Sequence, residues 1–250
     1  MEAYAVSDIG RVRASNQDYW FASPEPVGIL PNLFIVADGM GGHQGGEFAS
    51  GFTVETLAEL IAGAEGQSSV AVVRQCIEET NRRLYAKSEE FPHMAGMGTT
   101  LVVAWLEGGI LYTANVGDSR LYLIREAERP SESIRQITRD HSFVEEMVAE
   151  GRIERGSRFY RERKNIITRA IGVAETVRVD FFENPCLPGD VILLCSDGLT
   201  NMLPDEEIYE ILNRTEGTRE QAEELVKEAN LRGGKDNITA VLVYPYEGEE

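Results

Sequence analysis

The stretch LFIVADGMGGH, from Leu33 to His43, joins a short apolar run to an Asp-Gly pair. The stretch VILLCSDGL, from Val191 to Leu199, repeats this arrangement. Apolar runs of this length, rich in β-branched residues, are typical of buried β-strands. Each stretch therefore predicts a strand that ends on a carboxylate, Asp38 in the first and Asp197 in the second. The glycine that follows lets the backbone turn sharply or bring its carbonyl close to a bound ion.

A third carboxylate, Asp236 in GGKDNITAVLV, stands before an apolar run rather than after one. In an antiparallel pair the end of one strand lies beside the start of its neighbour, so Asp236 can meet the other two acids at one end of a sheet. Hard cations such as Mg²⁺ and Mn²⁺ prefer oxygen ligands of this kind. A single Asp-Gly pair is most often an ordinary turn, so it is the three acids together that predict a metal site.

Short apolar runs elsewhere predict further strands, and two glycine-containing turns, Gly108–Gly109 and Gly117–Ser119, are expected to join strands as hairpins of an antiparallel meander. The expected strands cover residues 99–106, 111–116, 121–124 and 239–244. Apolar residues at helical spacing predict helices over residues 47–62 and about 70–84. Ser142 with Glu145, and Thr218 with Gln221, are expected to begin two more helices as capping pairs. Without repeats or linkers, the pattern predicts one α+β domain over residues 1–250.

Composition excludes several classes of protein. The chain has 24 Lys and Arg against 42 Asp and Glu, a net charge of −18, which disfavours nucleic acid as a partner. No run approaches the roughly 20 apolar residues of a membrane span, and no targeting segment is visible, so no membrane association is expected. The three cysteines, Cys76, Cys186 and Cys195, have neither disulfide-framework nor zinc-site spacing, which predicts a cytoplasmic protein.

Eight motifs along the chain resemble, in order, those of the type 2C metal-dependent serine/threonine protein phosphatases in their compact bacterial form. They are GRVRASNQD (10–18), VADGMGGHQGGE (36–47), GTTLVVA (98–104), ANVGDSRLYL (114–123), DHS (140–142), NIITRAIG (165–172), LLCSDGL (193–199) and DNITAVLV (236–243). The resemblance implies a central antiparallel β-sandwich flanked by α-helices, a four-layer αββα arrangement. It also implies a monomer that dephosphorylates phosphoserine and phosphothreonine in proteins and opposes a serine/threonine kinase in signalling.

The resemblance also implies roles for individual residues around two Mn²⁺ or Mg²⁺ ions. Asp38, Asp197 and Asp236 would hold the first ion, and Asp38 with the carbonyl of Gly39 would reach the second, so that Asp38 bridges them. Asp118 would join Asp197 at a weaker third ion. Asp18 would support the site through metal-bound water. Arg13 would bind phosphate through its planar guanidinium, and a water activated by the two metals would attack phosphorus in line.

Two departures from the family pattern affect the expected chemistry. Many eukaryotic members have a histidine directly after the Asp-Gly pair, whereas Met40 stands there in this chain. The leaving alkoxide needs a proton, for which His43 or a metal-bound water are the alternatives. His141 is expected to make structural hydrogen bonds, and His93 is expected to be an ordinary loop residue. The family's usual His-Pro before Asn165 is replaced by Arg161 and Glu162.

A flap over the edge of the active site is expected at about residues 140–172, and it is basic. Seven cations stand against two acids, Glu154 and Glu162, between residues 152 and 169. The cations could steer an anionic phosphopeptide, or they could form ion pairs within a solvated loop. The cations are Arg152, Arg155, Arg158, Arg161, Arg163, Lys164 and Arg169.

Two other functions compete with the phosphatase. A catalytically silent binding module with the same fold should have lost some of the metal acids or Arg13, and all of them are present. A metal phosphodiesterase or nuclease would share the two-metal chemistry but should carry a basic groove for its polyanion. Only the flap is basic, so the protein phosphatase is the favoured prediction.

Overall fold

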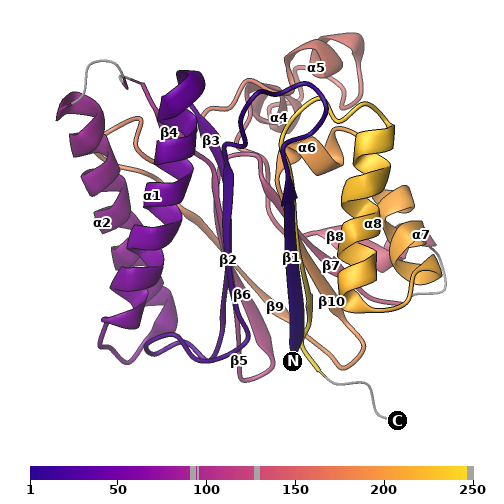
Figure 1. Cartoon of the computed structure of the whole chain (residues 1–250), viewed down its shortest axis with the longest axis horizontal. Helices are drawn as coiled ribbons and strands as arrows, with labels where there is room; N and C mark the ends of the chain where they lie inside the picture. The colour runs from indigo at the N-terminus through magenta and orange to yellow at the C-terminus, as the bar shows by residue number, and fades with distance from the viewer. Residues whose placement is uncertain (91–93, 95, 127–129, 247–250) are drawn as a thin grey trace.

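The chain folds into two antiparallel sheets packed face to face between two layers of helices (Figure 1). The computed structural model describes residues 1–90, 94, 96–126 and 130–246, with the backbone alone at residues 43, 44, 130 and 131. One sheet has the strand order β1 (Glu2–Asp8), β11 (Ile238–Tyr244), β10 (Val191–Cys195), β7 (Arg120–Ile124) and β8 (Ile134–Gln136). The other has the order β2 (Asp18–Ser23), β3 (Leu33–Met40), β5 (Leu101–Glu107), β6 (Ile110–Val116) and β9 (Asp180–Pro185), and β4 (Gly98–Thr99) pairs with β3. The predicted α+β sandwich is confirmed.

Helices form the two outer layers and the upper end of the sandwich in Figure 1. The helices α1 (Gly42–Ala62) and α2 (Ser69–Glu90) cover the sheet that contains β3, on the left of the picture. The helices α7 (Asp205–Arg214) and α8 (Thr218–Leu231) cover the other sheet, on the right. The short helices α4 (Phe143–Ala149), α5 (Arg158–Arg163) and α6 (Asp197–Thr200) lie at the upper end, and α3 (Pro130–Ser133) precedes β8.

The central strands are apolar on both faces because each face is covered. Along β10, Leu193 and Cys195 pack in the core under α7 and α8, whereas Ile192 and Leu194 pack in the core between the sheets. A third core lies between α1, α2 and the sheet that contains β3. Continuous apolar runs, rather than alternating ones, are what a strand buried on both faces requires. This explains why LFIVA and VILLC decide the fold.

Two local predictions are wrong. The turn at Gly117–Ser119 is not a hairpin, because β6 and β7 belong to different sheets and the chain crosses the sandwich there. Gly117 has a φ of 103°, and a Cβ on it would lie 2.7 Å from the side chain of Thr100, so this crossing needs glycine. Thr218 does not cap α8: Gly217 is the N-cap, and the Gln221 amide donates hydrogen bonds to the carbonyls of Leu212 and Thr215.

Other predicted elements are confirmed with shifted bounds. The hairpin at Gly108–Gly109 joins β5 and β6, with Glu107 opposite Ile110. Ser142 caps α4 by accepting a hydrogen bond from the Glu145 amide at 3.3 Å. The helix predicted over residues 47–62 begins earlier, at Gly42, three residues after Gly39 of the first Asp-Gly pair. This early start places the first turns of α1 against the upper end of the sandwich.

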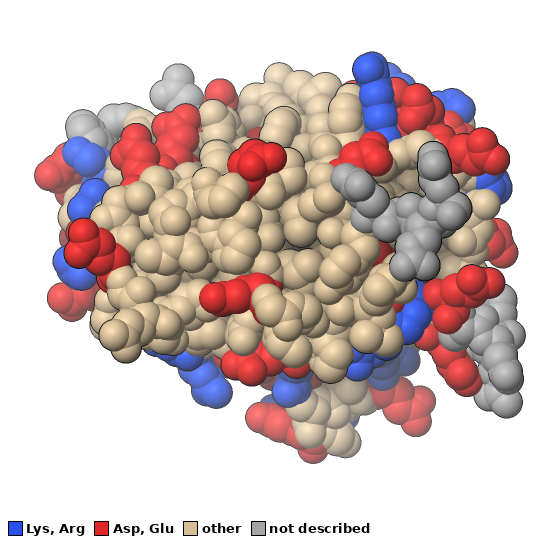
Figure 2. Space-filling view, turned by 90° about the horizontal axis from the view of Figure 1, so that it is seen from below, with Lys and Arg blue, Asp and Glu red and all other residues tan. Residues whose placement is uncertain are grey.

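Charge is unevenly distributed over the two ends of the sandwich. Figure 2 shows the lower end, where most of the surface is uncharged and acidic side chains are scattered. The predicted metal acids lie at the opposite end, where β3 and β10 end and β11 begins. Their grouping is therefore a local feature of that end.

Candidate metal centre and active site

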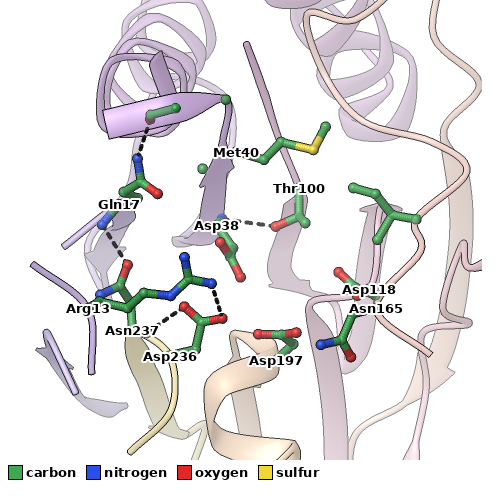
Figure 3. Close-up of a pocket in the computed structure, with 14 residues that line it drawn as sticks. Arg13, Gln17, Asp38, Met40, Thr100, Asp118, Asn165, Asp197, Asp236 and Asn237 are labelled. Atoms are coloured by element: carbon green, nitrogen blue, oxygen red, sulfur yellow. Dashed lines mark hydrogen bonds and ion pairs between the residues drawn. The ribbon is translucent and has the colours of Figure 1, made fainter. Parts of the chain in front are cut away.

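Four of the predicted metal acids line one pocket of about 410 Å³ at the upper end of the sandwich. Figure 3 shows Asp38, Asp118, Asp197 and Asp236 pointing into the same space, with Arg13 entering from one side. They come from both sheets: Asp38 from β3, Asp118 from the β6–β7 crossing, Asp197 from the start of α6, and Asp236 from the loop before β11. Gly39 also lines the pocket. The structure thus brings together residues that are up to about two hundred positions apart in the sequence.

The strand registers explain this convergence. The strands β10 and β11 are antiparallel neighbours with Cys195 opposite Ala240, so the residues after β10 lie beside the residues before β11. That places Asp197 next to Asp236, as predicted. In the other sheet Asp18 is directly opposite Asp38 in the β2–β3 pair. The two pairs of acids therefore meet across the top of the sandwich.

The glycines of the two Asp-Gly pairs are required by close backbone contacts. A Cβ on Gly39 would lie 2.0 Å from the carbonyl oxygen of Gly46 in α1. A Cβ on Gly198 would lie 1.9 Å from the carbonyl oxygen of Asn237. Any side chain at either position would push α1 or the start of β11 away from the pocket. Glycine is thus needed because neighbouring backbone approaches the carboxylate-bearing segment.

Burial and mutual repulsion raise the pKa of the clustered carboxyl groups. Burial, followed by the charges of Asp18 and Asp197, raises the pKa of Asp38 well above its ordinary value. Burial raises the pKa of Asp118 to about 7, with Asp197 adding to the effect. The pKa of Asp197 is raised to about 6, by burial and by Asp236. Like charges held together away from water favour the protonated form unless a cation neutralises them.

Asp18 lies beneath this cluster and is 6% exposed. Its Oδ2 accepts hydrogen bonds from Ser196 Oγ and Thr239 Oγ1, both at 2.7 Å, while its Oδ1 is buried without a partner. Burial raises the pKa of Asp18 to about 7 despite these two hydrogen bonds. One oxygen of Asp18 is therefore fixed by residues of the opposite sheet, and the other, buried oxygen has no hydrogen-bond partner among the described residues.

The residues fit hydrated divalent cations. All the charged donors are oxygens, which Mg²⁺ and Mn²⁺ prefer. Asp197 Oδ1, like Asp18 Oδ1, is buried without a hydrogen-bond partner, which a cation or its water would supply. Among the described residues no three acidic, His or Cys side chains are close enough to enclose an ion by themselves. Such an open arrangement suits a cation that keeps several of its waters.

A family model described as "Protein phosphatase 2C" matches residues 10–233, most of the 250-residue chain. The chain belongs to the protein phosphatase 2C family. The serine/threonine phosphatase stp of Listeria monocytogenes is 39% identical over 252 residues, covering 97% of this chain and 95% of the relative. Protein phosphatase PhpP of Streptococcus pneumoniae is 37% identical over 249 residues, covering 97% of both chains.

Solved structures of the protein phosphatase 2C family agree with the fold. The serine/threonine phosphatase Stp1 from Staphylococcus aureus has a TM-score of 0.88 at 34% identity, covering 99% of this chain and 95% of that chain. The catalytic domain of PstP in complex with 2 manganese ions has a TM-score of 0.81 at 36% identity, covering 96% of both chains. The resemblance predicted from the motifs is confirmed, and so is the predicted enzyme class, a metal-dependent protein phosphatase. No described helix is long and apolar enough to cross a membrane.

The predicted phosphate ligand, Arg13, lies at the rim of the pocket. Its guanidinium donates a hydrogen bond to Asp236 Oδ2 at 2.7 Å, and its side chain is 51% exposed. Asn237 holds the loop that carries it, because the Asn237 amide donates to the carbonyls of Ile9 and Ser15 at 2.9 Å. Arg13 is thus tied to a predicted metal ligand on one side and open to solvent on the other.

Of the three histidines of this protein phosphatase 2C member, the structure describes the side chain of His141 alone. His43 falls in the first turn of α1, but its side chain lies outside the described residues, as does His93, so both predictions stand untested. His141 is buried, accepts a hydrogen bond from the Gly117 amide at 3.1 Å through Nδ1, and contacts Asp180 Oδ2 at 3.2 Å through Nε2. Its predicted structural role is confirmed, and burial lowers its pKa.

Most cations of the flap are used in ion pairs. Five of the seven pair with carboxylates at 2.5–3.8 Å: Arg152 with Glu150, Arg155 with Glu145, Arg158 and Arg163 with Glu162, and Arg169 with Asp180. Arg161 donates a hydrogen bond to the Gly156 carbonyl at 2.5 Å. Of the two explanations offered for the basic flap, internal ion pairing accounts for these cations.

Lys164 differs from the other flap cations because its side chain has neither an ion pair nor a hydrogen bond among the described residues. It lines a small cavity of about 120 Å³ together with Asp118, Asn165 and Asp197. Burial lowers the pKa of Lys164 from its ordinary value, and the nearby charge of Asp197 acts in the opposite sense. One flap cation therefore faces the predicted metal acids directly.

Sequence reasoning missed several polar residues that shape the pocket. Thr100 accepts a hydrogen bond from the Asp38 amide at 2.9 Å through Oγ1, which fixes the end of β3. Gln17 donates to the Gly42 carbonyl at 2.9 Å and lines the pocket, as does Asn165 from the flap. All three stand within recognised motifs, so the motifs located them. Their roles depend on contacts between distant segments, for which the sequence carries no separate signal.

Proposed function

We propose that this protein hydrolyses phosphoserine and phosphothreonine in other proteins, using two divalent cations, Mn²⁺ or Mg²⁺. The observation that carries the proposal is the convergence of Asp38, Asp118, Asp197 and Asp236 with Arg13 on one pocket. A silent module would have no need to keep clustered carboxylates whose pKa values are raised by burial and by one another's charge. Such a cluster is costly to a folded protein, and catalysis is the best reason to retain it.

Each residue has a distinct task in the proposed reaction. Asp38, Asp197 and Asp236 would hold one cation, Asp38 and the Gly39 carbonyl a second, and Asp118 with Asp197 a third. The bound cations would supply Lewis acidity toward phosphate and activate water. Asp18 would orient water through its unpaired oxygen. Arg13 would bind phosphate oxygens, and the flap would exclude water on the side of Asn165.

The proton for the leaving alkoxide is proposed to come from His43 or from water. If His43 donates it, His43→Ala should slow hydrolysis of a phosphothreonine peptide more than that of p-nitrophenyl phosphate, whose leaving group needs little protonation. Equal losses on both substrates would remove His43 from this role. The two substrates are measured with one enzyme preparation, so loss of folded protein affects both alike.

The biological setting follows from the proposed reaction. The substrates would be phosphoproteins made by a serine/threonine kinase that this enzyme opposes in signalling, with the enzyme acting as a monomer. We also propose a cytoplasmic location, which is supported by three cysteines that are free and buried. A role on nucleic acid or at a membrane is not proposed.

Phosphate release from p-nitrophenyl phosphate and from a phosphothreonine peptide tests the proposal. We expect turnover of both with Mn²⁺ or Mg²⁺ and none with a chelator. Asp118→Asn should leave turnover at high metal concentration and change its dependence on metal concentration. Turnover that persists in the chelator, or no turnover of either substrate with either metal, would contradict the proposed function.

A further inference from the structure

A second pocket of about 470 Å³ lies between α1 and the edge strand β2, beside the end of the sandwich that carries the active site. We call it the α1 groove. It is formed where α1 crosses the first residues of β2, the edge strand of its sheet. It is lined by Tyr19, Glu47, Phe48, Phe52, Glu55 and Met94, with Gly51 at its floor.

The floor of the α1 groove is aromatic. Phe48 and Phe52 stack on successive turns of α1, with ring centroids 5.5 Å apart, and both pack against the core beneath. Tyr19, which is 39% exposed, forms the opposite wall. The groove is open between the rings because residue 51 is glycine: a Cβ there would lie 3.6 Å from the Tyr19 ring. Aromatic walls around an open floor suit an apolar side chain from a partner.

The rim of the α1 groove is acidic, and no Lys or Arg stands among its described lining residues. Glu47 and Glu55 are both exposed, and α1 contains three glutamates without a single Lys or Arg. Glu55 accepts a hydrogen bond from Tyr19 Oη at 3.0 Å, and neither Glu47 nor Glu55 has an ion pair within the part of the chain that the structure describes. Elsewhere on the surface most arginines and lysines pair with neighbouring acids. The unbalanced rim therefore complements a basic partner.

The α1 groove and the active site share their two structural elements. Gln17 and Gly42 line the active-site pocket, and the Gln17 amide donates to the Gly42 carbonyl at 2.9 Å. Tyr19 lies on β2 two residues after Gln17, and Glu47 lies on α1 five residues after Gly42, so the same two stretches of chain line both pockets. A substrate chain that leaves the active site over Gln17 would reach the groove within a few residues.

We propose that the α1 groove binds a segment of the phosphoprotein substrate, close to the phosphorylated residue, in which an apolar side chain is followed by Lys or Arg. The apolar side chain enters between Tyr19 and the two phenylalanines, and the cation pairs with one of the two rim carboxylates, Glu47 or Glu55. The inference rests on the proposed function, because it names a substrate feature that the same enzyme would select. The groove adds affinity outside the pocket, so it lowers KM without changing the chemical step.

Two phosphothreonine peptides test the proposal, identical except that one carries Leu-Arg and the other Ser-Ser at the positions expected to reach the groove. A small series with the pair moved by one residue at a time locates its best distance from the phosphothreonine. We expect the Leu-Arg peptide to have a KM roughly three- to tenfold lower, with the same kcat. Equal KM values for the two peptides at every spacing would overturn the proposal.

Variants of the groove separate the charged and apolar contributions. The double variant Glu47→Gln, Glu55→Gln removes the rim charge, and Gly51→Leu fills the floor at a helical position whose backbone accepts a side chain. Each should abolish the preference for the Leu-Arg peptide and leave hydrolysis of p-nitrophenyl phosphate unchanged. The matched control is Glu59→Gln, which removes an exposed charge of α1 outside the groove and should keep the preference. A preference that survives both groove variants would also overturn the proposal.

A binding measurement keeps this test separate from the test of catalysis. Fluorescence polarisation with an unphosphorylated, labelled Leu-Arg peptide reports occupancy of the groove without any turnover. If the wild type binds the peptide, the groove variants do not, and no substrate is hydrolysed, peptide binding by the α1 groove is supported and the proposed function is contradicted. If substrates are hydrolysed but the peptide binds the wild type and the groove variants equally, the proposed function is supported and peptide binding by the α1 groove is contradicted.

Discussion

The floor of the active site and the flap that borders it are built by opposite means. The floor presents Asp38 from β3, Asp118 from the β6–β7 crossing and Asp197 from the start of α6 as partly buried carboxylates, and their pKa values are raised by burial and by one another's charge. The flap consists of two short helices whose exposed arginines are paired with glutamates. Carboxylates that repel one another without a counter-charge therefore indicate where a ligand binds. Arginines that are already paired with glutamates indicate a segment that holds its own shape.

The flap has its own buried anchor. Glu145, only 5% exposed, accepts a hydrogen bond from Tyr160 Oη at 2.5 Å and pairs with Arg155 at 2.5 Å. These contacts join α4 to α5 and so set the position of Lys164 and Asn165, which follow α5 toward the pocket. Four predictions, from the largest expected effect to the smallest, test the contrast between floor and flap.

The largest effect is expected for Asp38→Asn. Removing the proposed bridging carboxylate should lower kcat/KM for p-nitrophenyl phosphate in Mn²⁺ by more than about a hundredfold. Mutation of residues that only hydrogen-bond to metal ligands already lowers metal affinity or activity by about 10- to 100-fold. In chelator the same variant should unfold at a higher temperature than the wild type, because it lacks one of several repelling buried charges. A variant with near-normal turnover, or a metal-free variant less stable than the wild type, would show that Asp38 is an ordinary structural residue.

The second prediction concerns the pH dependence of the metal-free protein. The pKa values of Asp18 and Asp118 are raised to about 7 and that of Asp197 to about 6, against about 3.9 in an unfolded chain. Between about pH 4 and pH 7 the folded state therefore holds more protons than the unfolded state, so these groups stabilise it at low pH and this stabilisation is lost as pH rises.

Thermal unfolding at pH 5 and pH 8, with chelator and with Mn²⁺, measures this effect. Mn²⁺ should raise Tm more at pH 8 than at pH 5, because at pH 8 it neutralises carboxylates that at pH 5 are already protonated. The Asp118→Asn variant, which lacks one of the shifted groups, should show a smaller difference between the two pH values in chelator. If Mn²⁺ raised Tm equally at both pH values, the repulsion proposed between the carboxylates of the floor would be contradicted.

The third prediction concerns the flap anchor. Tyr160→Phe removes one hydrogen bond to the buried Glu145. A hydrogen bond to a charged group contributes about 1.5–3 kcal/mol to the free energy of unfolding. We expect kcat/KM for a phosphothreonine peptide to fall several-fold and that for p-nitrophenyl phosphate to fall by less than about twofold, since the small substrate depends less on the flap. Tyr4→Phe is the matched control, because Tyr4 donates to the exposed Glu223 at 2.9 Å, far from the flap. Equal losses on both substrates would contradict a positioning role.

The same contrast explains what the sequence could predict. The floor was predictable because Asp38 and Asp197 follow apolar runs within two residues, and Asp236 precedes one, so local pattern and strand pairing place them together. The crossing at Gly117–Ser119 was mistaken for a hairpin because glycine-rich turns look alike whether the next strand joins the same sheet or the opposite one. The Glu145–Tyr160 contact was missed because a hydrogen bond between two short helices leaves no periodic pattern.

The smallest effect is expected for Arg158→Gln in the flap. Arg158 is 86% exposed and pairs with Glu162 one helical turn away, a pair of a kind that contributes about 0.3–0.5 kcal/mol. If internal pairing is all that this cation does, kcat/KM for an acidic phosphopeptide should change by less than about twofold, and its dependence on salt should be unchanged.

Lys164→Gln removes the same charge from the flap at a position where the cation lies beside Asp118 and Asp197. It should lower kcat/KM for the acidic phosphopeptide more than Arg158→Gln does. The difference between the two variants should shrink as salt screens the charge. If Arg158→Gln instead reduced kcat/KM as strongly as Lys164→Gln, with the same salt dependence, steering by the whole basic flap would be favoured over internal pairing. The two variants therefore decide whether charge on the flap acts on substrate generally or only where it faces the floor.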